Sequence, residues 1–145
     1  MVTIGLPALL DEHRVRSPLP PDVLWNALAR SLPGFTSATL ARVLGTRPAR
    51  PAGVLPDAGS TIPGFRVAES AAGSRLVLVG EHRLATYALV FSILESEPAT
   101  GTELLATSYA DFHRPPGRVY RVLLLRSGMH QRLLRKFLRH VAAGG

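Results

Sequence analysis

The sequence predicts an α+β fold in which a curved antiparallel sheet is wrapped around a long C-terminal helix. Two observations predict it. Between residues 65 and 112, short runs rich in Val, Leu, Phe, Tyr and Thr alternate with turn-like breaks, which is typical of a meander of strands. Residues 117–141 then combine a broad apolar stripe with a basic stripe at helical spacing, which indicates one amphipathic helix.

The N-terminal part is expected to supply one strand and two short helices. Residues 13–19 read as a first strand. Pro21 suits the first turn of a helix, where its missing N–H has no partner, and apolar residues recur at helical spacing over 21–30. A second short helix is expected at 35–44. The Pro/Gly-rich stretch 46–64 is expected to be a loop or to hold one or two irregular edge strands.

Four further strands are expected in the meander, separated by turn-like residues. They comprise residues 65–70, 74–82, 84–95 and 102–112. In the segment 84–95 both alternate sets of side chains are apolar. A sheet with one solvated face would alternate apolar with polar residues. The second face is therefore expected to be covered as well, and a homodimer is one way to cover it.

The positive charge of the chain is concentrated in its C-terminal part. The net charge is +7, and every charged residue after Asp111 is basic, which gives that segment a charge of +8. Such a stripe can attract nucleic acid or anionic lipid, but the solvated outer face of a terminal helix is the preferred interpretation. Because no aromatic residue is interleaved with the basic ones on this stripe, nucleic acid is not an expected partner.

Several kinds of chemistry lack support in the sequence. There is no cysteine, and no two of the five histidines are four residues apart, so neither a metal nor another cofactor is expected. There is no Gly-x-Ser-x-Gly elbow. The N-terminus lacks the basic region of a signal peptide, and no apolar run approaches the ~20 residues of a spanning helix. A cytoplasmic protein without a transmembrane segment is therefore expected.

Two polar residues fall on the apolar side of the expected terminal helix. At about 100° per residue, Ser127 and His130 share the side that carries Leu134 and Leu138. Burying a polar group without a partner costs roughly 1–3 kcal/mol. Both residues therefore need hydrogen-bond partners, water or a ligand. They are either satisfied core residues or part of the lining of a cavity.

The order of elements and several local motifs resemble those of the SRPBCC superfamily. This is the helix-grip fold shared by START lipid-transfer domains, plant pathogenesis-related allergens and polyketide aromatase/cyclases. The motifs are SPLPPDVLW at 17–25, IPGFRV at 62–67, LVLVGEHR at 76–83, YALVF at 87–91 and GRVYR at 117–121. The resemblance implies a single ligand-binding domain over 1–145, with a seven-stranded sheet gripping the terminal helix around a cavity. It supplies no universal catalytic motif.

Seven polar or aromatic residues are candidates for lining such a cavity. They are Trp25, His82, Tyr87, Tyr109, Tyr120, Ser127 and His130. A pocket of this kind is mostly apolar and holds few directing polar groups. Ordinary strand packing is the alternative for Tyr87 and Tyr109, and surface exposure is the alternative for His82. For Trp25 the alternative is a place in the core.

Three functions follow as hypotheses. The first is a non-catalytic carrier or sensor for an apolar small molecule of the lipid, polyketide or isoprenoid type. The second is an aromatase/cyclase-type enzyme, with His130 as acid/base and Tyr87 or Tyr120 polarising a carbonyl. The third is a surface binder of nucleic acid or anionic membrane through the basic helix. The lack of a catalytic constellation favours the first.

Overall fold

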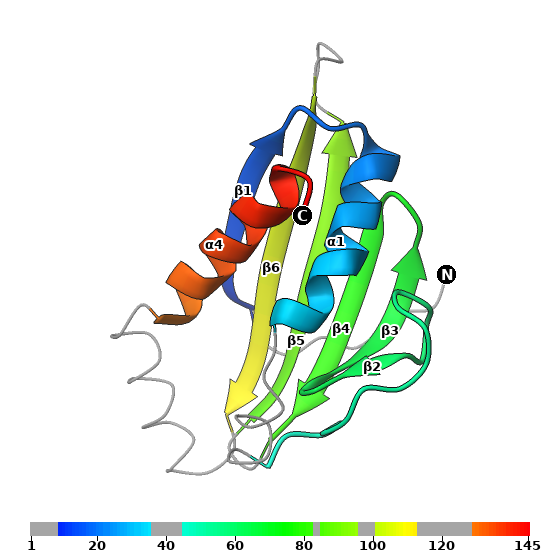
Figure 1. The fold of residues 1–145 in the computed structure, drawn as a ribbon. Coiled ribbons are helices and arrows are strands. Elements are labelled where there is room, and N and C mark those ends of the chain that lie inside the picture. Colours follow the sequence, from blue (N-terminus) through cyan, green and yellow to red (C-terminus); the bar gives the residue numbers. More distant parts are fainter. Residues whose placement is uncertain (1–8, 36–44, 83–84, 96–100, 113–128) are drawn as a thin grey trace.

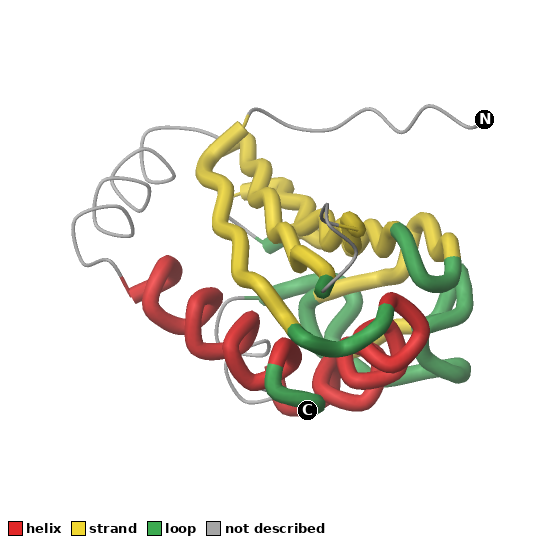
Figure 2. Tube along the Cα trace, turned by 90° about the horizontal axis from the view of Figure 1, so that it is seen from above, coloured by secondary structure: helices red, strands yellow, loops and turns green. Residues whose placement is uncertain are grey.

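The protein is built from one antiparallel sheet with helices on one of its faces. A computed structural model describes residues 9–35, 45–82, 85–95, 101–112 and 129–145. The strands follow the order β1-β6-β5-β4-β3-β2, and both described helices lie on the same side of the sheet (Figure 1, Figure 2). The elements are β1 Leu9–Ser17, α1 Pro21–Phe35, β2 Thr61–Ile62, β3 Phe65–Ala71, β4 Arg75–Glu81, β5 Ala85–Glu95, β6 Thr102–Phe112 and α4 Met129–Ala142. The expected α+β class is confirmed.

The meander strands agree closely with the sequence pattern, whereas the first strand does not. β1 begins at Leu9 and ends at Ser17, so it lies earlier in the chain than the expected segment 13–19. The pairing of β1 with β6 shifts register near Leu9, and that of β3 with β4 shifts near Val67. Bulges of this kind bend a strand and increase its twist, which contributes to the curvature of the sheet. The resemblance implied seven strands, and the described part of the chain contains six.

Helix α1 is longer than expected. The sequence predicted a helix over residues 21–30, but the helix continues to Phe35. Leu32 is fully buried, and the ring centroid of Phe35 lies 4.6 Å from that of Phe137 on α4. These contacts offset the low helix propensity of the last turn. The second short helix expected at 35–44 falls almost wholly outside the described residues.

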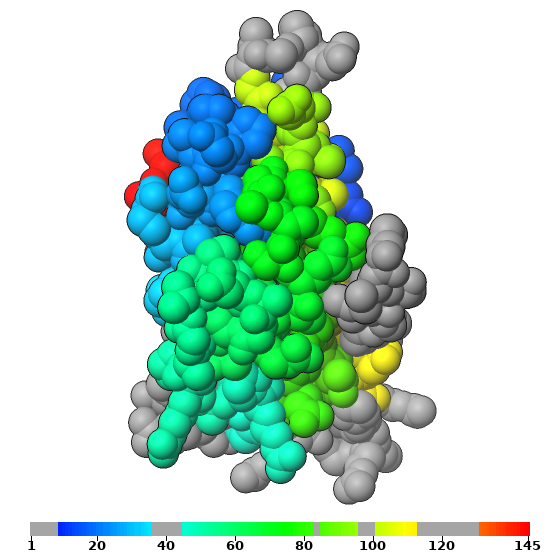
Figure 3. Space-filling model, turned by 90° about the vertical axis from the view of Figure 1, so that its right-hand side faces the viewer, coloured from blue at the N-terminus to red at the C-terminus, as the bar shows by residue number. Residues whose placement is uncertain are grey.

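The proline-rich segment 45–60 is a loop hydrogen-bonded to the sheet. It lies against β3 and below α1 on the surface in Figure 3. The N–H of Val67 donates to the carbonyl of Ser60 at 2.8 Å. The turn between β2 and β3 is made by Pro63 and by Gly64, whose φ is 91°, because glycine adopts positive φ without steric cost. The stretch is thus mostly loop, and β2 is its irregular edge strand.

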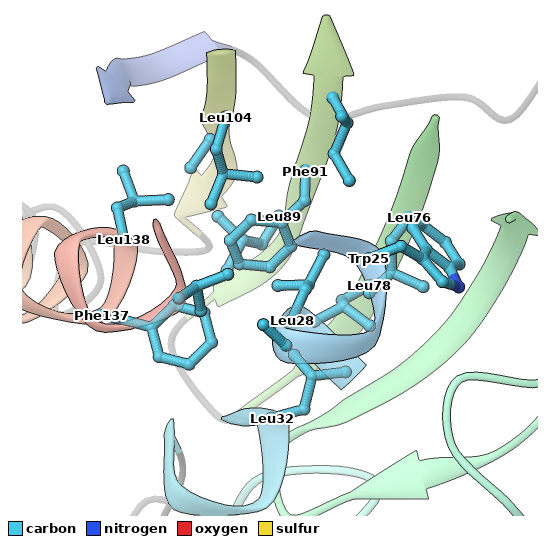
Figure 4. Packing of buried hydrophobic residues seen from close by; sticks show 14 of the residues in the cluster. Trp25, Leu28, Leu32, Leu76, Leu78, Leu89, Phe91, Leu104, Phe137 and Leu138 are labelled. Atoms are coloured by element: carbon cyan, nitrogen blue, oxygen red, sulfur yellow. The ribbon is translucent and has the colours of Figure 1, made fainter. Parts of the chain in front are cut away.

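The core lies between the helices and one face of the sheet (Figure 4). Leu28 of α1, Leu138 of α4, and Leu78 and Phe91 of the sheet are at most 1% exposed and belong to one cluster. Burying a side chain of this size contributes about 1.5–3 kcal/mol. The cluster therefore accounts for the attachment of both helices to the sheet.

Helix α4 is amphipathic in the way the sequence predicts. Leu134 is fully buried, and Arg132 is exposed on the opposite side. The C-terminal end of the helix is held by Ser17, whose hydroxyl donates to the carbonyl of Ala142 at 2.7 Å. The expected helical residues 117–128 lie outside the described part of the chain. Neither described helix has the length and apolar character needed to cross a membrane.

Candidate functional site

The helix-facing side of the sheet changes character along its length. Near the end where β1 stops, Val15, Leu104 and Ile93 lie side by side on three adjacent strands, all in contact with the core. Farther along β6 the helix-facing side chains are small. These three residues, the small row, are Ala106, Ser108 and Ala110. Ala106 is 0% and Ser108 4% exposed, so both are covered, and their small size lets whatever covers them pack close to the backbone of β6.

One side of the small row is bordered by an acid–imidazole pair on β1. Asp11 lies opposite Ser108, and His13 lies opposite Ala106. His13 Nε2 is 3.5 Å from Asp11 Oδ2, and the two side chains are only 14% and 12% exposed. The imidazole Nε2 and both carboxylate oxygens are themselves buried. Because burial strengthens electrostatic interactions, this pair places a strong hydrogen-bonding group beside an apolar surface.

On the other side, β5 places Phe91, Leu89 and Tyr87 beside the small row. Phe91 and Tyr87 belong to a continuous series of rings, the aromatic row. It consists of Phe91, Phe137, Phe35, Phe65, Tyr87 and His82, in order of contact. Successive ring centroids are 4.6–6.1 Å apart, within the range in which aromatic pairs attract. Phe35, Phe65 and Tyr87 are only half-buried. The row therefore runs from the packed core to an accessible aromatic edge.

Tyr87 is held in place by its hydroxyl. The O–H donates to the carbonyl of Gly64 at 2.6 Å. Gly80, which pairs with Tyr87 across the strands, permits this approach, since a Cβ there would overlap the Gly64 carbonyl and the Tyr87 ring. A phenol has one proton to donate. Polarising a ligand carbonyl would therefore require Tyr87 to give up the bond to Gly64.

Two of the seven residues chosen from the sequence come together in the structure. The ring centroids of His82 and Tyr87 lie 5.5 Å apart, at the accessible end of the aromatic row. Trp25 is 7% exposed and belongs to the hydrophobic core, where Figure 4 places it beside Leu76 and Leu78. The core alternative therefore describes Trp25 better than a position at the small row.

The other sequence-predicted residues are not brought to this surface by the described structure. Tyr109 pairs with Ala88, and strand alternation places both on the face of the sheet opposite the helices. Tyr120 and Ser127 lie outside the described residues. His130 belongs to the backbone of α4, but its side chain is also outside the described part. That the side chains of Tyr120, Ser127 and His130 line a cavity remains a prediction.

Sequence reasoning missed the polar side of the site, Asp11 and His13. The signal was present in β1, where Glu12, Arg14 and Arg16 alternate with Asp11, His13 and Val15. Period-two alternation would have assigned the charged set to one face and left Asp11 and His13 on the other. The expected strand began at residue 13, so the alternation was not visible.

Helix α4 also presents a basic outer face. Its exposed cations are Arg132, Arg135, Lys136 and Arg139. Among the residues that the structure describes, none of these four takes part in an ion pair. Leu133 is 57% exposed beside them. Within the same described ranges, no three His, Asp or Glu side chains are grouped so that they could hold a metal ion.

Comparison with known proteins shows a likeness in fold rather than in sequence. No family model matches the chain, and no curated protein matches it at a significant level. A Mesorhizobium loti protein of solved structure superposes with a TM-score of 0.55 at 14% identity, covering 91% of this chain and 93% of that one.

Two further solved structures are similar. CalU16 from Micromonospora echinospora has a TM-score of 0.55 and 18% identity, and the match covers 90% of this chain and 74% of CalU16. DynU16, from the dynemicin biosynthetic locus, has a TM-score of 0.57 and 13% identity, with 92% and 47% covered. At these identities the likeness defines the fold class. A curved six-stranded antiparallel sheet with helices on one face is consistent with a helix-grip protein.

Proposed function

We propose that the protein binds an apolar small molecule of the lipid, polyketide or isoprenoid type between the sheet and the C-terminal helix, as a non-catalytic carrier or sensor. The observation that carries this proposal is the small row. Ala106 and Ser108 stand directly beside Phe91 and Leu89 on the next strand, so β6 carries small side chains where its neighbour carries bulky ones. Apolar walls with a few directing polar groups are typical of small-molecule sites.

Two further points support a ligand-binding function. The resemblance to the SRPBCC superfamily implies apolar ligands held between sheet and helix. One structural neighbour, DynU16, comes from a biosynthetic locus, a setting in which small molecules are handled. Ser127 and His130, which helical periodicity assigns to the inner side of the terminal helix, remain proposed contributors to the same site.

Equilibrium dialysis of the full chain against naphthalene and decanoic acid tests this proposal. Ala110→Leu should weaken binding about tenfold or more, because the larger side chain fills the space above β6 at a typical overpacking cost of roughly 1–3 kcal/mol. Ala71→Leu is the matched control, since Ala71 is half-buried on the opposite face of the sheet. Failure of the wild type to bind either probe, or equal binding by both variants, would contradict the proposal.

The second candidate is an aromatase/cyclase-type enzyme. In this scheme His130 is the general acid/base, a role that contributes about 10²–10⁴-fold in rate. Because the hydroxyl of Tyr87 already donates to Gly64, polarisation of the carbonyl falls to Tyr120. If the His130→Ala variant turned over a polyketide substrate at the wild-type rate, this candidate would be abandoned.

The third candidate is a surface binder that uses the outer face of α4, and the exposed Leu133 among the cations favours anionic membrane over nucleic acid. Apolar and basic side chains together are typical of helices that lie on anionic lipid. Sedimentation with phosphatidylcholine vesicles, with and without phosphatidylserine, measures this directly. Replacing Arg132, Arg135 and Arg139 by Gln should abolish the fraction of protein that sediments only with phosphatidylserine-containing vesicles. If the wild type shows no such fraction at low salt, this candidate function is contradicted.

A further inference from the structure

We propose that residues 1–8 lie as an extended strap across the sheet face opposite the helices and cover the apolar patch at its centre. This outer patch consists of Val77, Ala88, Val90 and Thr107. The inference is independent of the proposed ligand-binding function, because it concerns the other face of the sheet. It identifies the partner of that face as a segment of the same chain.

The outer patch is buried although both described helices lie on the other face of the sheet (Figure 1, Figure 2). Val77 pairs with Val90, and Val90 pairs with Thr107, so they form one row across three strands. Strand alternation places this row opposite Leu78 and Leu89, which belong to the core. Val77 is 0% and Val90 6% exposed. A solvated sheet face would leave these side chains accessible to water, so we assign their cover to a segment outside the described ranges.

The ends of the row are marked by charged residues. Glu12 pairs with Thr107 at one end, and Glu69 pairs with Val77 at the other. The side chains of Arg75 and Glu69 are 42% and 36% exposed, so they extend into water rather than close over the row. A second copy of the chain is the alternative cover. Val77 is fully buried within a single copy, which favours a segment of the same chain.

Composition distinguishes residues 1–8 from the other segments outside the described ranges. Those others are residues 36–44, 83–84, 96–100 and 113–128. Each of them contains at least one charged side chain, whereas residues 1–8 contain none. Burying an unpaired charge costs far more than burying an apolar group. Val2, Ile4 and Leu6 recur with period two, so one side of an extended chain would carry all three and suit an apolar sheet face.

The position of Leu9 brings the strap to the outer patch. Leu9 begins the edge strand β1 and pairs with Tyr109, which in turn pairs with Ala88 of the patch. From β1 to β4 the sheet covers three strand spacings, about 14 Å, and eight extended residues reach about 26 Å. Residues 1–8 are therefore long enough to cross the patch from the edge at which the described chain begins.

Thiol modification tests the strap, because the chain contains no cysteine. Val77→Cys in the full chain should react with a water-soluble disulfide reagent at least about tenfold more slowly than Val54→Cys, since Val54 is 71% exposed. Adding Ile4→Asp should raise the rate at position 77 about tenfold or more, because a carboxylate cannot be buried against the patch without a large cost. Thr3→Asp, on the other alternate set, is the matched control and should leave the rate unchanged.

Equal rates in the Ile4→Asp and Thr3→Asp backgrounds would overturn the proposal. So would a wild-type dimer, seen by light scattering, that protects position 77 only at high protein concentration, because a second copy would then be the cover. Leu78→Cys faces the core and should stay protected in both backgrounds. If it does not, the Ile4→Asp protein has unfolded, and nuclear Overhauser contacts in the wild type decide: Ile4 methyl groups should contact Val77 or Val90, and their absence would overturn the strap.

Discussion

The hydroxyl of Ser17 donates to the carbonyl of Ala142 at 2.7 Å, joining the end of β1 to the end of α4 across 125 positions of sequence. The same oxygen accepts from the N–H of Leu19 at 3.2 Å. Ser17 is 3% exposed, so both bonds are shielded from water. One side chain thus fixes the end of α4 against the edge strand.

Replacing Ser17 by Ala should lower the free energy of unfolding by about 1–3 kcal/mol, because the carbonyl of Ala142 and the N–H of Leu19 lose their partner in a buried setting. Urea denaturation followed by circular dichroism measures the change. Ser74→Ala serves as control, since its hydroxyl bond to Ala71 is exposed, and it should cost less than about 0.5 kcal/mol. Equal effects of the two substitutions would contradict the assignment of Ser17.

Gly80→Ala should destabilise the protein by about 1–3 kcal/mol or more, because the added Cβ would overlap the Gly64 carbonyl and the Tyr87 ring. Gly34→Ala is the matched comparison. No atom lies within 4 Å of a Cβ built at Gly34 in helix α1, so alanine there should gain up to about 1 kcal/mol of helix propensity. Thermal unfolding of both variants measures these changes in stability. A Gly80→Ala protein as stable as the wild type would contradict the close approach of Gly80 to the Gly64 carbonyl and the Tyr87 ring.

Tyr87→Phe should cost about 0.5–1.5 kcal/mol, the net value of the hydrogen bond to Gly64, while the ring contacts with Phe65 and His82 persist. Tyr109→Phe provides the control on the opposite face of the sheet, with an expected change within about 0.5 kcal/mol. The pair is compared by chemical denaturation. A larger loss of stability for Tyr109→Phe than for Tyr87→Phe would contradict the assignment of the stabilising hydroxyl hydrogen bond to Tyr87.

Leu134→Ala should reduce stability by about 2–5 kcal/mol, because it opens a cavity in the core beneath α4. Its neighbour Leu133 is 57% exposed, whereas Leu134 is fully buried. Leu133→Ala should therefore change stability by less than about 0.5 kcal/mol. This adjacent pair reports the rotational setting of the helix, and a reversed order of effects would require the helix to face the other way.

The sheet could be predicted from sequence because its strands carry a strong local signal. The segments around Leu78, Leu89 and Leu104 are rich in aliphatic and aromatic residues and are bounded by turn residues, and the observed strands match them. The end of α1 was less predictable. Pro33 is a local helix-ending signal, and the burial of Leu32 and the contact of Phe35 with Phe137 override it.

The candidate site was harder to predict because its parts meet only in the folded chain. Asp11 and Ser108 are far apart in sequence and adjacent in the sheet, since β1 pairs with the last strand of the meander. Tyr109 was chosen for its residue type, but strand parity places it on the face opposite Tyr87. Residue type predicts the chemistry of a side chain, whereas the pairing register of its strand determines which face of the sheet the side chain lies on.

The most direct test of a ligand site above β6 is a titration of the ¹⁵N-labelled protein with naphthalene, followed by backbone amide shifts. Saturable shifts should centre on Leu89, Ser108, Ala110 and His13, which border the small row. Absence of saturable shifts would contradict the account. So would shifts centred on Val90, Thr107 and Tyr109 with none at the small row.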